Sequence, residues 1–353
     1  MNETATILHD TAERLFADAF TPAMLRRAAE GEWLDGQWRR LEELGFTAAL
    51  VPEEAGGAGL EPVEALGLVR LAGYYGVPLP LAETLLAGWL LARAGLAVPA
   101  GALTVGPVRP ADRLVLRRDG GGWRITGVLG RVPWARHAAE VAALAAHDGR
   151  NMLCRLSPDD YRLEAAVNLA GEPRDTLRVD ARLDGSRLTA APEDMGSQAL
   201  LAAGAVLRSL AMAGAVDRIL SMSVDYAGER RQFGRPIGKF QAVQQNLAVL
   251  AAQTAAAGAA ADIAAEAFAP SPDLLAVAVA KQRTGEAAGL AARIAHQVHG
   301  AIGFTEEHSL HFFTKRLWAW RDEFGREREW CRLVGRRAAE AGADSLWPLI
   351  VAV

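Results

Sequence analysis

The sequence is poor in cysteine, with only Cys154 and Cys331 among its 353 residues. Two isolated thiols cannot supply the disulfide framework of a small secreted domain or the four ligands of a structural zinc site. Such a low content is ordinary for proteins of a reducing compartment. We therefore predict a cytoplasmic protein.

The sequence also lacks an excess of charge of one sign. Its 38 Lys and Arg residues stand against 42 Asp and Glu residues, which gives a formal net charge of −4. Binding to nucleic acid depends on a concentrated basic surface that neutralises phosphates. We therefore expect no nucleic-acid partner.

Long hydrophobic runs are missing as well. The longest apolar stretches are interrupted by Arg93 and by Arg208, whereas a bilayer-spanning helix needs about 20 consecutive apolar residues. Residues 1–12 include Glu3 and Asp10 and have no apolar core of the signal-peptide type. We expect neither a membrane span nor a secretory signal.

Several common site motifs are absent too, including the P-loop and the Gly-x-Ser-x-Gly elbow. The glycine-rich run at 56–59 follows no strand with dinucleotide-binding spacing. Two histidine pairs, His296/His299 and His308/His311, have a helical spacing that can hold a metal. No acidic residue recurs beside both pairs, so we favour histidines on a helix surface or at a domain interface and expect no metal.

What is present divides the sequence into three parts. Residues 1–98 carry helical apolar spacing, residues 99–190 alternate short β-type runs with turn residues, and residues 191–353 are helical and rich in alanine. The order predicts an α+β protein with an N-terminal helical domain, a small central antiparallel β domain and a C-terminal four-helix bundle.

Individual elements follow from local signals. In the central part, runs at 114–117 and 123–126 flank Asp119-Gly120-Gly121-Gly122, which predicts a hairpin, and further strands are expected at 141–145, 152–156 and 177–183. In the last part, we expect one helix through 216–224 and a second over 241–268. A third should run from a cap at Ser271-Pro272-Asp273 to His299, and a fourth should begin at Thr305.

The first informative segment is Tyr226–Gln241, at the corner between two predicted helices. It places Arg230, Gln232 and Phe233 within one turn. Guanidinium groups pair with phosphates and an aromatic ring packs on a ring system, so this corner can receive the diphosphate of a nucleotide cofactor. A solvated basic turn is the alternative.

The second segment is His296–Thr305, where Gly300 and Gly303 lie between helices. Glycine lets a ligand approach the backbone closely. The alternative is a simple helix stop.

Together the two segments resemble the C-terminal domain of the acyl-CoA dehydrogenase family, in which an Arg-x-x-Phe-Gly turn precedes a Gln-x-x-Gly-Gly-x-Gly turn. The loop Val51–Leu60 resembles the Pro-acidic-acidic-Gly-Gly loop of the family's N-terminal domain, and the β part lies where the family has its sheet. The fold we expect is therefore acyl-CoA dehydrogenase-like.

The resemblance implies FAD held between subunits, an acyl-CoA thioester as substrate, and a homo-oligomer or a hetero-oligomer with a second family member. The residues it implies as cofactor contacts are Arg230, Gln232, Phe233, Gln297, Gly300 and Ala301. Ala301 stands where the family has its second glycine. The family's Thr-Glu-Pro-x-x-Gly-Ser segment has no match between Gly101 and Gly130.

The family's catalytic base is a glutamate, which removes the proton α to the thioester carbonyl. Its two known locations correspond here to Phe324 and to Gly204, and neither residue accepts a proton. The nearest carboxylate to the first location is Glu323, which is our candidate base. The alternative is that Glu323 is only part of a charged surface run.

Three functions remain open. The first is an FAD-dependent acyl-CoA dehydrogenase of fatty acid or steroid catabolism that performs α,β-dehydrogenation. The second is a catalytically incomplete partner subunit of a heteromeric acyl-CoA dehydrogenase. The third is a flavin oxidase or monooxygenase on the same scaffold, for which the sequence offers no positive sign.

Overall fold

The computed structural model of the protein describes residues 3–351, and its contacts divide the chain into two compact units. The first unit comprises Met1–Val69, Pro78–Gly204 and Phe268–Pro272, and the second comprises Arg70–Val77, Ala205–Ala267 and Asp273–Val353. This division into two units does not test the predicted three-domain boundaries after residues 98 and 190, which stay a prediction.

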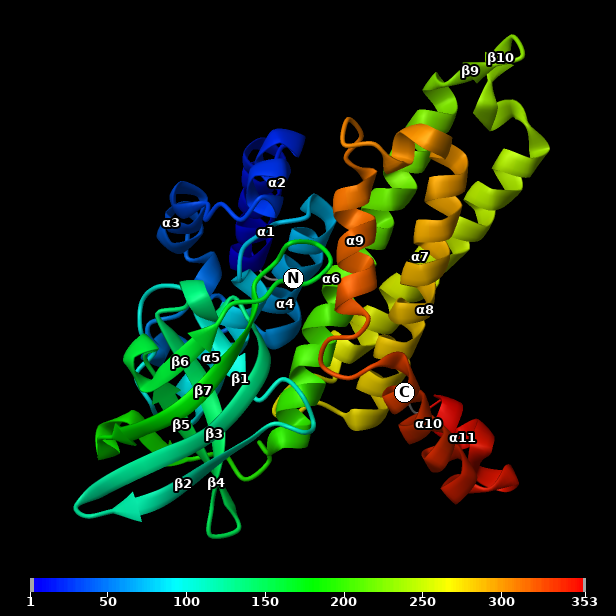
Figure 1. Ribbon diagram of the computed structural model, residues 1–353. Coiled ribbons are helices and arrows are strands. Elements are labelled where there is room, and N and C mark those ends of the chain that lie inside the picture. The colour runs from blue at the N-terminus through cyan, green and yellow to red at the C-terminus, as the bar shows by residue number, and fades with distance from the viewer. Residues whose placement is uncertain (1–2, 352–353) are drawn as a thin grey trace. The chain divides into compact units, whose positions relative to one another are not determined.

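The N-terminal part is helical, as the apolar spacing predicted (Figure 1). Its helices are α1 (Glu3–Ala19), α2 (Pro22–Ala29), α3 (Asp35–Glu43), α4 (Pro62–Tyr75) and α5 (Leu81–Arg93). Trp38 and Leu41 lie three residues apart on α3 and are both buried, because side chains at that spacing share one face of a helix.

The segment Val51–Leu60 is a loop, as its glycines predicted. Gly56 has a left-handed backbone with φ of 85°. A Cβ atom on Gly57 would lie 1.9 Å from the carbonyl oxygen of Val51. Both positions therefore require glycine for steric reasons.

In the described residues, the central strands form one eight-stranded sheet with the order β6-β7-β3-β2-β4-β5-β8, and β1 pairs with β4. Its strands are β1 (Leu103–Gly106), β2 (Arg113–Asp119), β3 (Gly122–Pro133), β4 (Glu140–His147), β5 (Arg150–Leu156), β6 (Tyr161–Glu164), β7 (Arg174–Leu183) and β8 (Leu188–Ala190).

The predicted hairpin is confirmed, since β2 and β3 pair antiparallel across the Asp119–Gly122 turn. The predicted central antiparallel β domain is present, but its sheet is mixed. Strand β1 runs parallel to β4, and β2 meets β4 in parallel at Val115 and Ala146. The intervening chain supplies the long crossover that parallel neighbours need.

Side chains alternate between the two faces of the sheet. On β2, Leu114 and Leu116 are buried while Arg113, Val115 and Arg117 are exposed. The inward side chains form one apolar core with Trp123, Ile125, Leu129, Val141, Ala143, Leu156, Leu177 and Val179. The other face of β2 and its neighbours keeps polar and charged side chains in solvent.

The helices of the C-terminal part are longer. They are α6 (Ser197–Glu229), α7 (Gln241–Glu266), α8 (Leu274–His299), α9 (Leu310–Trp320), α10 (Glu327–Ala341) and α11 (Leu346–Val351). Within the second unit, α8 packs along α7 and α10. A two-stranded hairpin of β9 (Arg231–Gln232) and β10 (Arg235–Pro236) connects α6 to α7 (Figure 1).

Two helix starts differ from the prediction. The side chain of Asp273 accepts hydrogen bonds from the backbone N–H groups of Leu275 and Ala276, so Asp273 is the N-cap of α8 and Pro272 lies before it. Helix α9 begins at Leu310 rather than at Thr305. A 3-10 turn covers Gly300–Phe304, and residues 305–309 form turns and bends before the helix starts.

Two described helices, α6 and α7, are long and apolar enough to cross a membrane by length and composition. Their mean hydropathies over 18 residues are 1.8 and 1.5. Core helices of globular proteins pass the same test, and 89% of the α6 window is buried inside the protein. Only 33% of the α7 window is buried, so α7 carries an open apolar face.

Candidate functional site

The corner predicted at Tyr226–Gln241 contains the β9–β10 hairpin, which lies between the last turn of α6 and the first turn of α7 (Figure 1). Gln232 pairs with Arg235 across it, and Phe233 and Gly234 make the turn with φ of 51° and 78°. Two successive residues of positive φ form the type of turn that matches the twist of a hairpin. A phenylalanine in this conformation is strained.

The side chains of this hairpin point into solvent. Phe233 is 92% exposed and meets the edge of Phe240, with ring centroids 6.1 Å apart. Arg230 and Gln232 are exposed too. The hairpin therefore offers a guanidinium, an amide and an aromatic ring that are not used for packing within the chain.

The second predicted turn follows α8. Gly300 ends the helix with φ of 66°, and open space surrounds the position where its Cβ would stand. Gln297 and Ala301 are exposed on either side of it. A ligand can approach this backbone without a steric obstacle from Gly300.

The structure brings the two turns together at one end of the second unit. The ring of Tyr226, four residues before Arg230, stacks on His299 of α8 with centroids 4.6 Å apart. The last turn of α6 and the last turn of α8 therefore lie side by side. All six predicted cofactor residues belong to this end of the second unit.

The histidine pairs are packed into the same end. His299 also meets the edge of His308 at 4.6 Å, and His296 stacks on Phe304 at 4.2 Å. His296 Nδ1 and His299 Nε2 are buried without a hydrogen-bond partner. Within residues 3–351, no group of three or more His, Cys, Asp or Glu side chains is arranged to hold a metal ion.

This packing gives a pH prediction. Burial, followed by repulsion from neighbouring histidines, lowers the pKa of His296 and His308, and burial also lowers the pKa of His299. The unfolded chain then binds more protons than the folded chain below pH of about 6.5, so the free energy of unfolding decreases as the pH falls through that value. Urea unfolding at neutral and mildly acidic pH measures this slope.

The variant H308Q, which removes one of the three clustered histidines, should flatten that slope. Equal slopes in the wild type and in H308Q would contradict the prediction.

The candidate base Glu323 lies in the turn between α9 and α10 and is buried. Its Oε2 accepts a hydrogen bond from Nε of Arg208 on α6 at 2.7 Å. The two side chains are 4% and 8% exposed, so the ion pair is almost dry. A buried charge of this kind needs its partner, because desolvating it alone is costly.

Hydrogen bonds from buried side chains hold the backbone of the turn that carries Glu323. Nζ of Lys281, a fully buried residue of α8, donates to the carbonyl oxygens of Arg321 and Gly325 at 2.8 and 2.9 Å. Nε1 of Trp330 donates to the carbonyl oxygen of Phe324 at 3.1 Å. Three carbonyls of one short turn are thereby bound by buried donors.

Burial is the largest influence on Lys281 and lowers its pKa to about 7, while the carboxylates of Glu323 and Glu327 act in the opposite direction. Both carbonyl oxygens that Lys281 contacts are acceptors, which suits the charged ammonium. Lys281 is therefore a positioning residue for the turn that carries Glu323.

Phe324, the first location at which the family's base was expected, lies beside Arg208. The guanidinium carbon of Arg208 lies 5.4 Å from the centroid of the Phe324 ring and 5.9 Å from that of Trp320. Gly204 precedes Arg208 by four residues on α6, which is one helical turn on the same face. Sequence reasoning missed Arg208 and Lys281 as members of this site.

A flavin dinucleotide is implied by the family resemblance, and the exposed donor set fits one end of it. A diphosphate needs charge-assisted donors, which the guanidinium of Arg230 supplies, and Gly300 leaves backbone accessible to a ligand. Phe233 offers a free aromatic face for a ring system.

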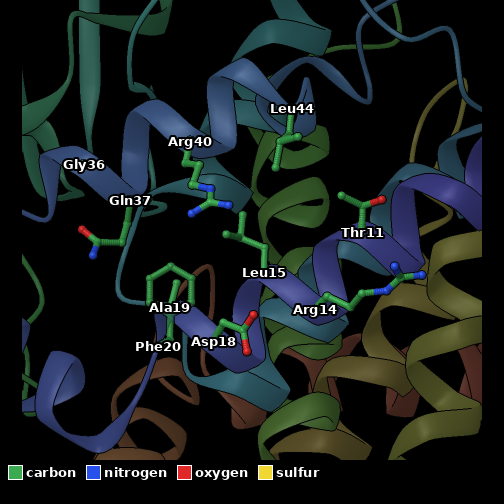
Figure 2. A pocket seen from close by; sticks show the side chains of 10 residues that line it. All are labelled: Thr11, Arg14, Leu15, Asp18, Ala19, Phe20, Gly36, Gln37, Arg40 and Leu44. Carbon is green, nitrogen blue, oxygen red and sulfur yellow. The ribbon is translucent and has the colours of Figure 1, made fainter.

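Two cavities lie elsewhere, within the first unit. A groove of about 460 Å³ runs between α1 and α3, where Figure 2 shows Arg40 pointing from α3 toward α1. A second cavity of about 410 Å³ lies beside the glycine loop, where Glu42 accepts a hydrogen bond from the N–H of Gly101. Neither cavity is lined by a predicted site residue.

Comparison with known proteins assigns these features to a family. The sequence matches "Acyl-CoA dehydrogenase, N-terminal domain" over residues 2–97 and "Acyl-CoA dehydrogenase, C-terminal domain" over residues 197–337. It is 30% identical to acyl-CoA dehydrogenase IpdE2 of Mycolicibacterium smegmatis over 94% of this chain and 98% of that protein. It is 31% identical to acyl-CoA dehydrogenase IpdE2 of Mycobacterium tuberculosis over 89% and 91%.

Solved structures agree in fold. The ChsE4–ChsE5 complex from Mycobacterium tuberculosis superposes with a TM-score of 0.88 at 24% identity, covering 97% of this chain and 99% of that chain. A variant of the Tcur3481–Tcur3483 steroid ACAD superposes with a TM-score of 0.84 at 27% identity, covering 96% and 98%. From the N-terminal helices to the last helices of the second unit, this chain belongs to the acyl-CoA dehydrogenase family of oxidoreductases.

Proposed function

We propose that this chain is the subunit of a hetero-oligomeric acyl-CoA dehydrogenase that contributes cofactor contacts and structure, while a second family member contributes the catalytic base. One observation carries the proposal: Glu323, the nearest carboxylate to the expected base position, is held in a buried ion pair with Arg208. A carboxylate in such a pair strongly favours its charged form and is a poor proton acceptor.

The turn around Glu323 supports the same role. To reach a substrate, the carboxylate would have to leave Arg208, and the backbone would have to leave Lys281 and Trp330. Each step exposes a buried polar group without a partner. The arrangement is that of a structural turn.

The cofactor we propose is FAD, which accepts a hydride in this family when it is bound. Arg230 would bind its diphosphate, with Gln232 and Phe233 beside it, and Gln297, Gly300 and Ala301 would line it from the second turn. The strain and the 92% exposure of Phe233 support this assignment, because residues held in unfavourable backbone conformations cluster at ligand contacts.

The open face of α7 supports an oligomer. Large exposed apolar surfaces mark protein contacts, and α7 is apolar yet only one-third buried. A relative named as the two-part Tcur3481–Tcur3483 steroid ACAD, at 27% identity, favours a heteromer over a homo-oligomer. We infer a cytoplasmic assembly without membrane span that acts on a steroid- or fatty acid-derived acyl-CoA thioester.

The test compares the purified chain with the same chain co-expressed with a second acyl-CoA dehydrogenase of its source organism. Octanoyl-CoA and a steroid side-chain CoA thioester are the probes, and flavin absorbance is the signal. We expect no bleaching with the chain alone and bleaching with the complex. In the complex, E323Q should change the rate by less than about twofold, because an interaction absent from the transition state has no effect on it.

A second variant shows whether a loss of rate in E323Q comes from misfolding caused by the unpaired charge of Arg208. R208M/E323L removes both charges of the buried pair and should also leave the rate of the complex intact. Bleaching by the chain alone that is lost in E323Q would instead establish the chain as an active dehydrogenase with Glu323 as its base.

A further inference from the structure

The outer face of the sheet in the first unit carries an unusual set of side chains. It is formed by β2, β3, β7 and β6, whose other face covers the apolar core. We call it the arginine face, and its exposed arginines are Arg113, Arg117, Arg124, Arg162, Arg178 and Arg182.

The strand register places these arginines opposite one another. Arg117 of β2 pairs with Arg124 of β3, and Arg124 pairs in turn with Arg182 of β7. Three guanidinium groups thus form one row across three strands. Like charges directly opposite each other destabilise a sheet.

A second row repeats the pattern. Arg178 of β7 pairs with Arg162 of β6 on one side and with Val128 of β3 on the other, and Val128 pairs with Arg113 of β2. Two rows that contain arginines on neighbouring strands therefore lie on one face of the sheet.

Carboxylates on the face neutralise only part of this charge. Three ion pairs are present, namely Arg124–Asp180, Arg178–Glu164 and Arg182–Asp119. Arg117 and Arg162 have no ion pair among the described residues, and Arg113 donates to backbone carbonyl oxygens. The face therefore keeps a net positive charge in a chain whose formal net charge is −4.

Apolar side chains lie between the two rows and within the second. Val115 of β2 is 37% exposed and pairs with Thr126 of β3. Val128, two residues further along β3, is 40% exposed. Arginine around an apolar centre is the composition that distinguishes protein–protein contacts from the rest of a protein surface.

We propose that the arginine face is a docking surface for a protein partner that presents an acidic patch. A protein is favoured over a nucleic acid because the rest of this chain is negative and would repel an extended polyanion. It is favoured over a membrane because aliphatic side chains as short as valine, set among arginines on a flat sheet, insert little into lipid. This surface lies outside the cofactor residues and is independent of the function proposed above.

The test uses fluorescently labelled poly-L-glutamate as the acidic probe, with the full chain at low and at physiological salt. The wild-type chain should bind it, and more weakly as salt increases. The double variant R117E/R162E changes two exposed arginines without ion pairs and should weaken binding by about tenfold or more. The matched control R336E/R337E makes the same charge change on exposed positions of α10 and should bind as the wild type does.

Equal losses in R117E/R162E and in the control would overturn the proposal, since binding would then depend on overall charge. Stronger binding to phosphatidylglycerol vesicles or to single-stranded DNA, lost in the same double variant, would overturn it in favour of those partners. R117T provides a readout without a probe: relief of the row of like charge should raise Tm. A lower Tm would show that Arg117 serves the fold, and would also overturn the proposal.

Discussion

Replacing Arg208 with methionine is expected to lower the free energy of unfolding by about 3–5 kcal/mol, because it leaves the carboxylate of Glu323 buried without its guanidinium partner. The loss of contact with the rings of Trp320 and Phe324 adds to this effect. Urea-induced unfolding of R208M and of the wild type measures the difference.

The double variant R208M/E323L separates the charge effect from packing. Once both charges are gone, the pair is replaced by apolar side chains of similar length, and stability should return to near the wild-type value or exceed it. If the double variant were as unstable as R208M, the destabilisation would come from lost packing and not from the stranded carboxylate.

If Arg230 binds the diphosphate of FAD, as we propose, replacing it with alanine in the proposed hetero-oligomer is expected to raise the Kd for FAD by about tenfold to a hundredfold. A hydrogen bond to a charged group contributes about 1.5–3 kcal/mol, and each 1.4 kcal/mol is a factor of about ten in Kd. Arg230 is exposed at the base of the β9–β10 hairpin, so its removal leaves the packing of the chain unchanged. Flavin content after dialysis and titration with FAD measure the loss.

Two further variants locate the effect. F233A, which removes an exposed ring, should also reduce flavin content, whereas R336A on α10 should not. Unchanged flavin content in both R230A and F233A would contradict a cofactor role for the hairpin.

Local sequence patterns were sufficient to predict most elements of the fold. The hairpin at Asp119–Gly122 follows from turn chemistry within a few residues, and capping chemistry located the start of α8 close to its observed N-cap, Asp273. The parallel pairing of β1 with β4 was missed because it joins segments separated by a whole hairpin, and a pattern of period two does not record strand direction. The start of α9 was placed too early because Glu306 and Glu307 imitate the acidic first turn of a helix.

The side chains that contact Glu323, near the expected position of the catalytic base, were harder to predict. The resemblance located Gly204, Glu323 and Phe324, but the partner of Glu323 lies 115 residues away in the sequence. One signal was available: Arg208 is a single charge in an otherwise apolar stretch of α6, and a charge in such a place requires a partner. Lys281 gave no such signal, because Gln282 and Arg283 follow it directly on α8.

The buried pair of Arg208 and Glu323 also has an evolutionary consequence. In a lineage that carries it, a single mutation at either residue leaves the other charge unpaired in the interior, so Glu323 is not released from the pair without a loss of stability. Both must change together, or a neutral intermediate must arise first, since mutations at contacting residues do not act independently. If a second family member supplies the base, as we propose, the buried pair makes that dependence difficult to reverse, because both residues have to change before Glu323 becomes available.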